Sequence, residues 1–225
     1  MANKMDGPEL EDGLVTVIVP ARNEEKFIAH CLDSIQSQTE TNLQIVVVDS
    51  ASTDRTAAIV RDYMERDPRI ELVHNPRAIT PTSLNAALKA ARGRWLVRVD
   101  AHSTVPPDYV KRAVHHLEEG TWGGVGGRKD GVGVTPAGRA IATVMASRFG
   151  VGNSLYHYGT EVQPTEHIPF GAYDTALLQD LGGWDERLIT NQDFELDYRL
   201  RKSGRELLFD PDIAIEWHCR QNVPD

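Results

Sequence analysis

The apolar positions of this chain follow two different spacings. Residues 14–20 and 43–49 are short, nearly continuous apolar runs that are rich in β-branched side chains, a pattern typical of strands buried on both faces of a parallel sheet. Between them, the apolar residues of the segment 27–35 recur at the spacing of one helix face. The start of the chain is therefore predicted to form a strand, a helix and a second strand.

The alternation of strand and helix patterns continues along the chain. Ser52 or Thr53 can cap a helix that extends to about Arg66, and Thr80-Pro81 opens another because proline is favoured in the first helical turn. Four strand and helix units in succession predict an α/β fold with a doubly wound, mostly parallel sheet and helices on both faces. The remaining expected elements are strands over 70–74 and 95–100, a helix end at Arg92, a helix from Pro107, an edge strand within 123–133, a mobile helix within 135–158, a helix after 190 and a strand over 213–217.

Composition favours one acidic domain. The chain has 225 residues, of which 40% are hydrophobic, which is enough for the core of a single domain. Its net charge of −9 argues against a nucleic-acid partner, because such proteins usually carry a basic face. We expect one domain over 14–218, with a polar, disordered tail over 1–13 before it and a short tail, truncated relative to a longer protein, over 219–225.

The cysteines and the apolar segments favour a cytoplasmic location. Cys31 and Cys219 are far apart and lack a C-x-x-C spacing, so the sequence indicates neither a disulfide framework nor a structural zinc site. The start of the chain has no apolar stretch like that of a signal peptide, and no later run approaches the roughly 20 apolar residues of a membrane span. We therefore expect no membrane span in this chain.

Polar residues gather where the predicted strands end, which is where parallel sheets bind ligands. Asp49 and Asp100 end two of these strands, and both are expected to face one crevice. Asp100 and His102 are two positions apart, so in an extended backbone their side chains could reach one divalent cation. A polar turn is the other interpretation. Because G-x-G-x-x-G, P-loop and G-x-S-x-G motifs are absent from the sequence, a dinucleotide enzyme and a serine hydrolase are disfavoured.

Four motifs resemble those of one enzyme family. Residues 17–25 (VIVPARNEE), 47–56 (VVDSASTDRT) and 84–93 (LNAALKAARG), followed by the Asp100 segment, are similar in order and spacing to the family-2 inverting glycosyltransferases of GT-A fold. Three further segments resemble the exopolysaccharide branch of that family, typified by succinoglycan glucosyltransferases. These segments are residues 75–85, 98–103 and 169–173.

The resemblance implies a nucleotide site at the strand ends. Residues 14–103 would form the nucleotide-binding half, and residues 104–218 would form the acceptor and catalytic half. Asp49 would bind the uracil or an equivalent base, although Ser50 stands where the family usually has a second Asp. The nucleotide-binding residues implied are Pro20, Ala21, Arg22, Asn23, Glu24, Asp49, Ser50, Ser52, Asn85 and Asp100.

The resemblance also implies a metal site, for Mn2+ or Mg2+. Asp100-Ala101-His102 stands where the family has its D-x-D metal motif. A neutral imidazole at His102 suits Mn2+ better than Mg2+, and His218 is a further candidate ligand. The other interpretation is that His102 only bonds a nearby backbone group.

An inverting transfer needs a base that takes the proton of the acceptor hydroxyl. From the residues alone, Asp193 could instead stabilise a helix start, with Thr190 completing an approximate capping box. The resemblance favours Asp193 as the base, with Gln192 in place of the family's Glu. Glu195 and Asp197 are expected to pair with Arg199 or Arg201.

Two turns are predicted on the acceptor side. One contains Gly171, which would let a sugar approach the backbone. The other contains Trp184, which would offer an apolar ring face or simply be core.

The expected activity is a metal-dependent, inverting transfer of a sugar from a nucleotide diphosphate. By resemblance the donor is UDP-glucose, and the acceptor is a glycan or polyprenyl-diphosphate-linked acceptor of exopolysaccharide synthesis. Peripheral membrane association, at the inner face of the membrane, is compatible with such an acceptor. Two other functions remain open: a non-catalytic module that binds nucleotides or glycans, and a sugar-nucleotidyltransferase, although residues 20–24 lack the glycines of a G-G-x-G-x-R turn.

Overall fold

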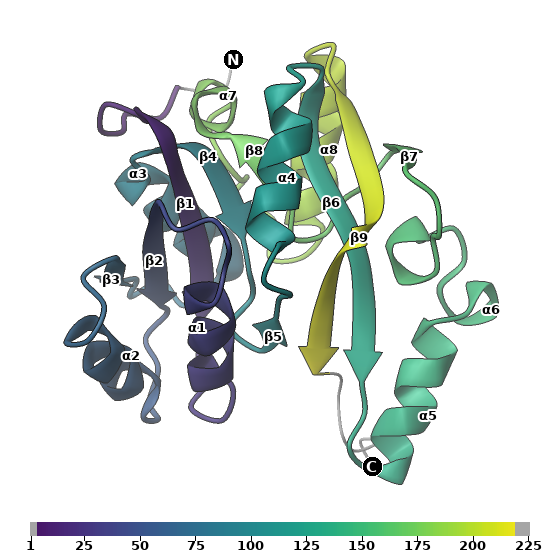
Figure 1. Cartoon of the computed structure of the whole chain (residues 1–225), viewed down its shortest axis with the longest axis horizontal. Coiled ribbons are helices and arrows are strands. Elements are labelled where there is room, and N and C mark those ends of the chain that lie inside the picture. The colour runs from purple at the N-terminus through teal and green to yellow at the C-terminus, as the bar shows by residue number, and fades with distance from the viewer. Residues whose placement is uncertain (1–3, 219–225) are drawn as a thin grey trace.

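The computed structural model describes residues 4–218, which form one nine-stranded sheet with helices packed on it (Figure 1). The strands are β1 (Glu11–Ala21), β2 (Leu43–Asp49), β3 (Ile70–His74), β4 (Gly93–Arg98), β5 (Ser103–Thr104), β6 (Trp122–Val132), β7 (Gln163–Thr165), β8 (Ala172–Asp174) and β9 (Glu206–His218). The helices are α1 (Ile28–Gln36), α2 (Thr56–Met64), α3 (Thr80–Ala90), α4 (Tyr109–Glu118), α5 (Pro136–Met145), α6 (Arg148–Val151), the short 3-10 helix η1 (Leu155–His157), α7 (Thr175–Asp180) and α8 (Gln192–Lys202).

The first half of the sheet has the predicted parallel pairing. Strands lie in the order β3-β2-β1-β4-β8-β6-β9-β5, with β7 beside β9. Pairing is parallel from β3 to β4, whereas β8 is antiparallel to both β4 and β6. Strand β6 was predicted at an edge but lies inside the sheet, between β8 and β9. Its glycines allow close packing on one face of the strand, because a Cβ at Gly124 or Gly126 would lie within 3.0 Å of the Ile168 side chain.

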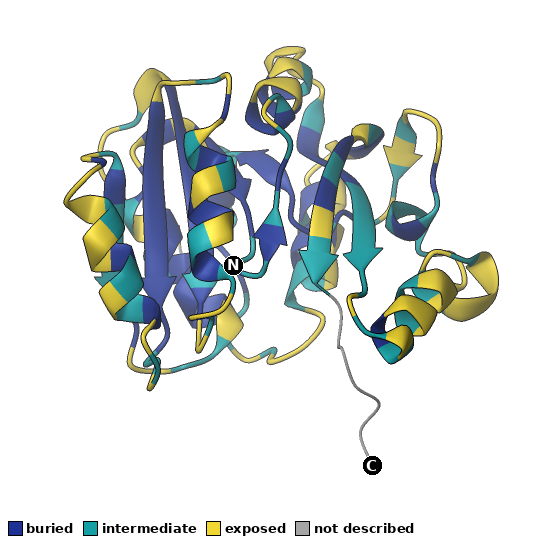
Figure 2. Cartoon of the chain, turned by 60° about the horizontal axis from the view of Figure 1, so that its bottom comes forward, coloured by how far each residue is buried: buried dark blue, intermediate teal, exposed yellow. Residues whose placement is uncertain are grey.

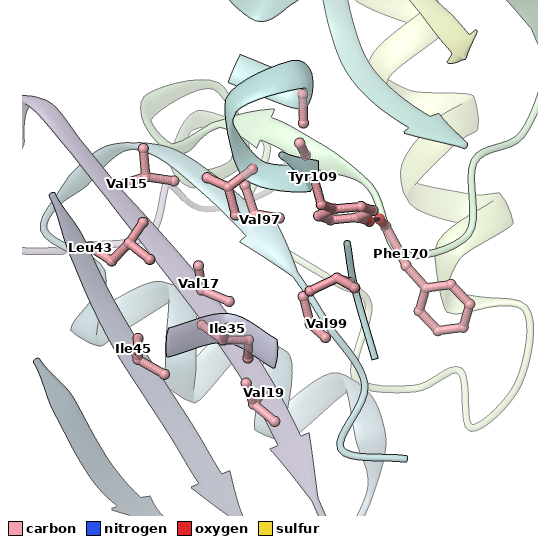
Figure 3. Close-up of a cluster of buried hydrophobic side chains, with 14 of the residues drawn as sticks. Val15, Val17, Val19, Ile35, Leu43, Ile45, Val97, Val99, Tyr109 and Phe170 are labelled. Carbon is pink, nitrogen blue, oxygen red and sulfur yellow. Dashed lines mark hydrogen bonds between the residues drawn. The ribbon is translucent and has the colours of Figure 1, made fainter. Parts of the chain in front are cut away.

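Alternate residues of the central strands face two separate hydrophobic layers. Val15, Val17 and Val19 of β1 pack with α1, α2 and α4 (Figure 3), whereas Ile18 packs with α3, α7 and α8 on the other face. The strands between these layers are buried almost throughout (Figure 2). Arg98 of β4 is paired in register with Ile18, so this charged residue belongs to a buried part of the sheet.

The segment before β1 packs against the domain. Strand β1 begins at Glu11, inside the stretch expected to be a disordered tail, because the Glu11 N–H donates to the carbonyl of Arg92 at 2.7 Å. The Met5 N–H likewise donates to the carbonyl of Gln179 at 2.9 Å. The predicted tail over 219–225, which contains Cys219, lies outside the described residues. Within residues 4–218, every helix is too short or too polar to cross a membrane.

Candidate functional site

The loop after β1 is held against the loop after β2. The Asn23 N–H donates to Oγ of Ser52 at 3.0 Å, and Oδ1 of Asn23 accepts the Thr53 N–H at 2.8 Å. The Glu24 N–H donates to Oγ1 of Thr56 at 2.7 Å. Ser52 therefore braces the first loop rather than capping α2, which begins at Thr56 without a side-chain cap. The two loops form one rigid rim at the carboxyl ends of the strands.

A cavity of about 230 Å³ opens beside this rim. It lies between the ends of β1 and β2, the turn after β4 and the starts of α3 and α8. Half of the residues that the sequence nominated for the site line it: Pro20, Ala21, Arg22, Glu24, Ser50, Asp100, His102 and Gln192. The structure thus brings together residues that are up to 172 positions apart in the sequence, from Pro20 to Gln192. The remaining lining residues are Ala78, Ile79, Thr80, Ser83 and Arg98.

Arg98 is the central cation of the site, and sequence reasoning missed it. Its Nε donates to Oδ1 of Asp100 at 2.9 Å, and its Nη1 donates to Oδ1 of Asp193 at 2.8 Å. The residue is only 5% exposed. Burial opposes its charge, but the two carboxylates outweigh burial and raise the pKa of Arg98. A charged residue two positions before Asp100 in an apolar strand was the signal that could have identified it.

Asp193 accepts hydrogen bonds from three donors. Besides Arg98, these are Nε1 of Trp184 at 3.2 Å, which bonds Oδ1, and Nε2 of Gln192 at 3.2 Å, which bonds Oδ2. Asp193 lies in the first turn of α8, which has Asn191 at its N-cap and no side-chain cap there. The approximate capping box is therefore wrong, and the carboxylate is turned toward Arg98 instead. Among residues 4–218, Oδ2 has a single hydrogen-bond partner, so it retains acceptor capacity for a proton.

Trp184 is part of the core, which was one of its two predicted interpretations, and Asn85 lies away from the nucleotide cavity. Trp184 is 1% exposed, so its ring face is not available to a sugar, and its indole meets Asp193. The Asn85 side chain accepts the Trp184 N–H and donates to the Trp184 carbonyl, each at 2.8 Å. Asn85 therefore fixes the turn that carries Trp184, rather than lining the nucleotide cavity. Asn85 thus holds Trp184, and the Trp184 indole in turn holds Asp193.

Gly171 is required by packing. A Cβ there would lie 2.4 Å from the ring and hydroxyl of Tyr173. The Gly171 carbonyl also accepts the Arg98 N–H at 3.2 Å. The absence of a side chain at Gly171 therefore makes room for Tyr173. This explanation of the glycine differs from the predicted one, which was the approach of a sugar to the backbone.

The chain turns between Asp100 and His102, so the extended geometry assumed for them is wrong. Strand β4 ends at Arg98, and the Ser103 N–H donates to the Asp100 carbonyl at 2.9 Å. Nδ1 of His102 lies 3.0 Å from Oε1 of Glu24. Burial lowers the pKa of His102, but the hydrogen bond to Glu24 and the nearby acidic charges outweigh it and raise that pKa.

The predicted metal ligands do not converge in this arrangement. The His218 ring stacks on Phe27 at 5.0 Å between ring centres, and the His218 N–H donates to the His102 carbonyl at 3.3 Å. Asp100 is neutralised by Arg98. Within residues 4–218 no three His, Cys, Asp or Glu side chains are grouped as a metal site. Among the described residues, Asp100 is therefore the remaining candidate ligand that lines the cavity with a carboxylate free of a histidine contact.

Asp49 is the last residue of β2 and Ser50 follows it, but the two side chains have different surroundings. Asp49 is buried, accepts the Ser52 N–H at 3.3 Å and lies 3.6 Å from Nδ1 of His74. Ser50 lines the cavity with Ser83, and their hydroxyls are 2.5 Å apart. The hydroxyl pair, rather than the carboxylate, forms this part of the cavity wall.

Lys129 is a second cation that sequence reasoning missed. It projects from β6 over the ring of Trp217 at 3.9 Å and that of Phe170 at 5.0 Å. Burial lowers its pKa to about 8, which the charges of Asp100 and Asp193 partly oppose. Lys129, which is partly buried among aromatic rings, therefore adds to the positive potential near Asp100 and Asp193.

The other acidic residues of α8 make structural pairs. Glu195 forms the predicted bidentate pair with Arg199, at 2.6 and 2.7 Å. Asp197 was expected to pair with an arginine, but its Oδ2 accepts instead from His167 at 2.6 Å and from the Ile168 N–H at 3.0 Å. Asp193 is therefore the acidic residue of this helix that is turned toward Arg98.

Comparison with known proteins identifies relatives of the whole domain. A family model described as "Glycosyl transferase family 2" matches residues 16–180. The succinoglycan biosynthesis protein ExoA of Rhizobium meliloti is 32% identical over 222 residues, which cover 97% of this chain and 67% of that protein.

Solved structures share the fold. S. aureus TarS 1-349 superposes with a TM-score of 0.71 at 25% identity, over 91% of this chain and 60% of that chain. The mannosyltransferase PcManGT from Pyrobaculum calidifontis, solved with GDP-Man and Mn2+, gives a TM-score of 0.70 at 28% identity, over 92% of this chain and 57% of that one. These likenesses confirm the predicted fold, and this chain spans about 60% of the structures it matches.

Proposed function

The chain belongs to glycosyl transferase family 2, a family of sugar-transferring enzymes, and from this premise we propose that it transfers a sugar from a nucleotide diphosphate with inversion at C1. One observation carries the proposal. Arg98 links Asp100, which lines the cavity, to Asp193 at the start of α8, so a cation and two carboxylates meet beside a cavity made of the motif residues. This arrangement supplies the charges that an inverting transfer requires.

The cavity is proposed as the donor site. Its walls present the Arg22 guanidinium and the hydroxyls of Ser50 and Ser83, which can bond a base, a ribose or a phosphate. Nη1 of Arg22 donates to the Ala78 carbonyl at 3.0 Å, so this side chain is already held across the cavity mouth. By family resemblance, the proposed donor is UDP-glucose.

Asp193 is proposed as the base. In a single displacement, the acceptor oxygen bonds to C1 of the sugar as the bond from C1 to the diphosphate breaks, and the hydroxyl proton passes to the carboxylate. Oδ2 of Asp193 has one partner and can take this proton, while Arg98 and Trp184 hold Oδ1. Arg98, which lines the cavity, is proposed to stabilise the negative charge of the leaving diphosphate.

A divalent cation, Mn2+ or Mg2+, is proposed to join with the donor. Such ions often bind through one or two carboxylates together with substrate phosphates, so Asp100 would suffice as protein ligand. When bound, the ion would neutralise charge on the diphosphate. The mannosyltransferase neighbour is described as a complex with GDP-Man and Mn2+, which supports this requirement.

The acceptor is proposed to be a glycan or a polyprenyl-diphosphate-linked glycan of a cell-surface polysaccharide. Similarity to a succinoglycan biosynthesis protein over nearly the whole chain supports this class. We expect the reaction to take place in the cytoplasm, at the inner face of the membrane where lipid-linked acceptors would be met.

A binding and turnover screen tests the proposal. UDP-glucose, GDP-mannose and dTDP-glucose would each be added with and without Mn2+, and melting temperature and release of free nucleoside diphosphate would be measured. We expect one donor to stabilise the chain in a cation-dependent manner, with slow hydrolysis. Asp100→Asn should abolish the cation dependence, whereas Asp62→Asn, at an exposed position on α2, should retain it. Absence of stabilisation and hydrolysis by all three donors would contradict the proposal.

A further inference from the structure

A second cavity, of about 510 Å³, lies next to the site without belonging to the donor pocket. It is bounded by the segments 153–158 and 164–167, by Arg148 and by Phe194. Phe194 follows Asp193 directly in α8, and consecutive Cα atoms are about 3.8 Å apart. The helix turn that carries the proposed base therefore borders this cavity. Its volume is within the range of small-molecule sites.

Aromatic rings form a continuous array in this cavity. The rings of His167 and Phe194 are stacked, with centres 3.6 Å apart and an angle of 14° between the planes. Tyr156 meets His167 edge-on at 5.4 Å, and the Arg148 guanidinium lies 5.4 Å from the centre of the Tyr158 ring. Phe194 remains 51% exposed despite this packing. An apolar ring face is therefore presented to whatever enters the cavity.

The His167 ring is held in a fixed orientation. Its Nδ1 lies 2.6 Å from Oδ2 of Asp197, a fully buried carboxylate that also accepts the Ile168 N–H. The carboxylate selects the tautomer or charge state with a proton on Nδ1. Among residues 4–218 the structure gives Nε2 of His167 no hydrogen-bond partner. The cavity wall thus contains a preorganised ring with one nitrogen available to a ligand.

Polar groups accompany the rings. Arg148, Asn153 and Glu166 line the same cavity and supply donors and acceptors of both charges. A pyranose presents axial C–H groups on one face and hydroxyls around its edge, so it matches an aromatic platform with a mixed polar border. A lipid chain would leave these polar groups desolvated and unpaired. The composition therefore favours a neutral sugar.

We propose that this aromatic cavity, built on Tyr156, His167 and Phe194, binds a pyranose unit of the acceptor glycan and so presents the acceptor hydroxyl to Asp193. The inference rests on the proposed function and adds the place of the acceptor. It also replaces the acceptor role predicted for Trp184, which is buried. Phe194 supplies the ring face, and Arg148 and Nε2 of His167 bond the sugar hydroxyls.

Saturation-transfer NMR on the full chain tests this site. The probes are cellobiose, lactose and N,N′-diacetylchitobiose, each a β-linked disaccharide with a continuous C–H face. We expect transfer to the ring protons of at least one probe. Phe194→Ala should weaken binding by about 2- to 10-fold, as expected for loss of one aromatic contact, and Phe194→Trp should preserve it. Tyr198→Ala is the matched control, because Tyr198 is an exposed aromatic residue of the same helix outside the cavity.

The outcomes separate this site from the donor site. Binding that is weakened in Phe194→Ala and Tyr156→Ala but unchanged in Tyr198→Ala supports the proposal. Binding that is unchanged in both cavity variants, or no transfer from any probe, overturns it. Donor stabilisation by nucleotide sugars should be unchanged in Phe194→Ala. If the chain binds a disaccharide here but no nucleotide sugar, the proposed function fails while this site stands.

Discussion

Replacing Arg98 by methionine should destabilise the domain and misplace the proposed base. Arg98 is buried and bonds Asp100 at 2.9 Å and Asp193 at 2.8 Å. Methionine keeps the apolar part of the side chain but removes the charge. The two carboxylates would then lose their shared cation and repel each other. Both stability and turnover should fall.

The expected loss in free energy of unfolding depends on how well water can hydrate the two carboxylates once Arg98 is replaced. Removing one partner of a buried ion pair typically costs about 3–5 kcal/mol. Here the side chains of Asp100 and Asp193 are 15% and 18% exposed, so partial hydration lowers the expected cost to about 2–3 kcal/mol. Arg94→Met, on the same strand but exposed at the surface, should cost less than about 0.5 kcal/mol.

Urea unfolding with a double-mutant cycle measures this effect. Wild type, Arg98→Met, Asp193→Asn and the double variant would be compared at constant m-value. We expect the double variant to be more stable than the sum of the single changes predicts, by about 1–3 kcal/mol. An Arg98→Met protein as stable as Arg94→Met, or a cycle without coupling, would refute the role assigned to Arg98.

Three further predictions concern other parts of the structure. The Arg69 guanidinium lowers the pKa of Asp67, so this pair stabilises the fold above the unfolded pKa of about 3.9, and that contribution is lost as pH falls toward the folded pKa. Asp67→Asn should therefore make the free energy of unfolding, measured with urea, depend less on pH in the acidic range. An unchanged pH dependence would contradict this prediction. Gly171→Ala should cost about 1–3 kcal/mol through overpacking against Tyr173, measured by urea unfolding; wild-type stability would show that the turn can yield. Trp184→Phe removes the indole N–H that bonds the proposed base but keeps a ring in the core. We expect kcat to fall about tenfold, equivalent to about 1.4 kcal/mol. An unchanged kcat would show that this hydrogen bond does not contribute to turnover.

Local pattern predicted the first half of the fold well. Strands β2 and β3 have the predicted bounds. For β2 this follows because a strand buried on both faces needs a nearly continuous apolar sequence. The helix at Thr80 followed from proline in its first turn. Strand β6 was misplaced at an edge, since a glycine-rich sequence does not reveal that Ile168 and Tyr173 pack against it.

The sequence nominated many residues of the candidate site but few of the contacts between their side chains. Motif order predicted that Asp100 and the loop at 20–24 lie together, because strand ends of a parallel sheet converge. Asp193 was nominated by family resemblance. The roles of Arg98 and Trp184 depend on contacts across 95 and 9 sequence positions, which no local pattern encodes. The turn after β4 likewise could not be distinguished from a longer strand, so His102 was paired with Asp100 instead of Glu24.

The kinetics of Asp193→Asn test the central claim most directly. Donor affinity would be measured by titration of the nucleotide sugar selected by the screen, and turnover by release of nucleoside diphosphate. The account predicts donor affinity close to wild type and turnover reduced by about 10²- to 10⁴-fold, the usual contribution of a general base. Full turnover by this variant would contradict the assignment of Asp193 as the base.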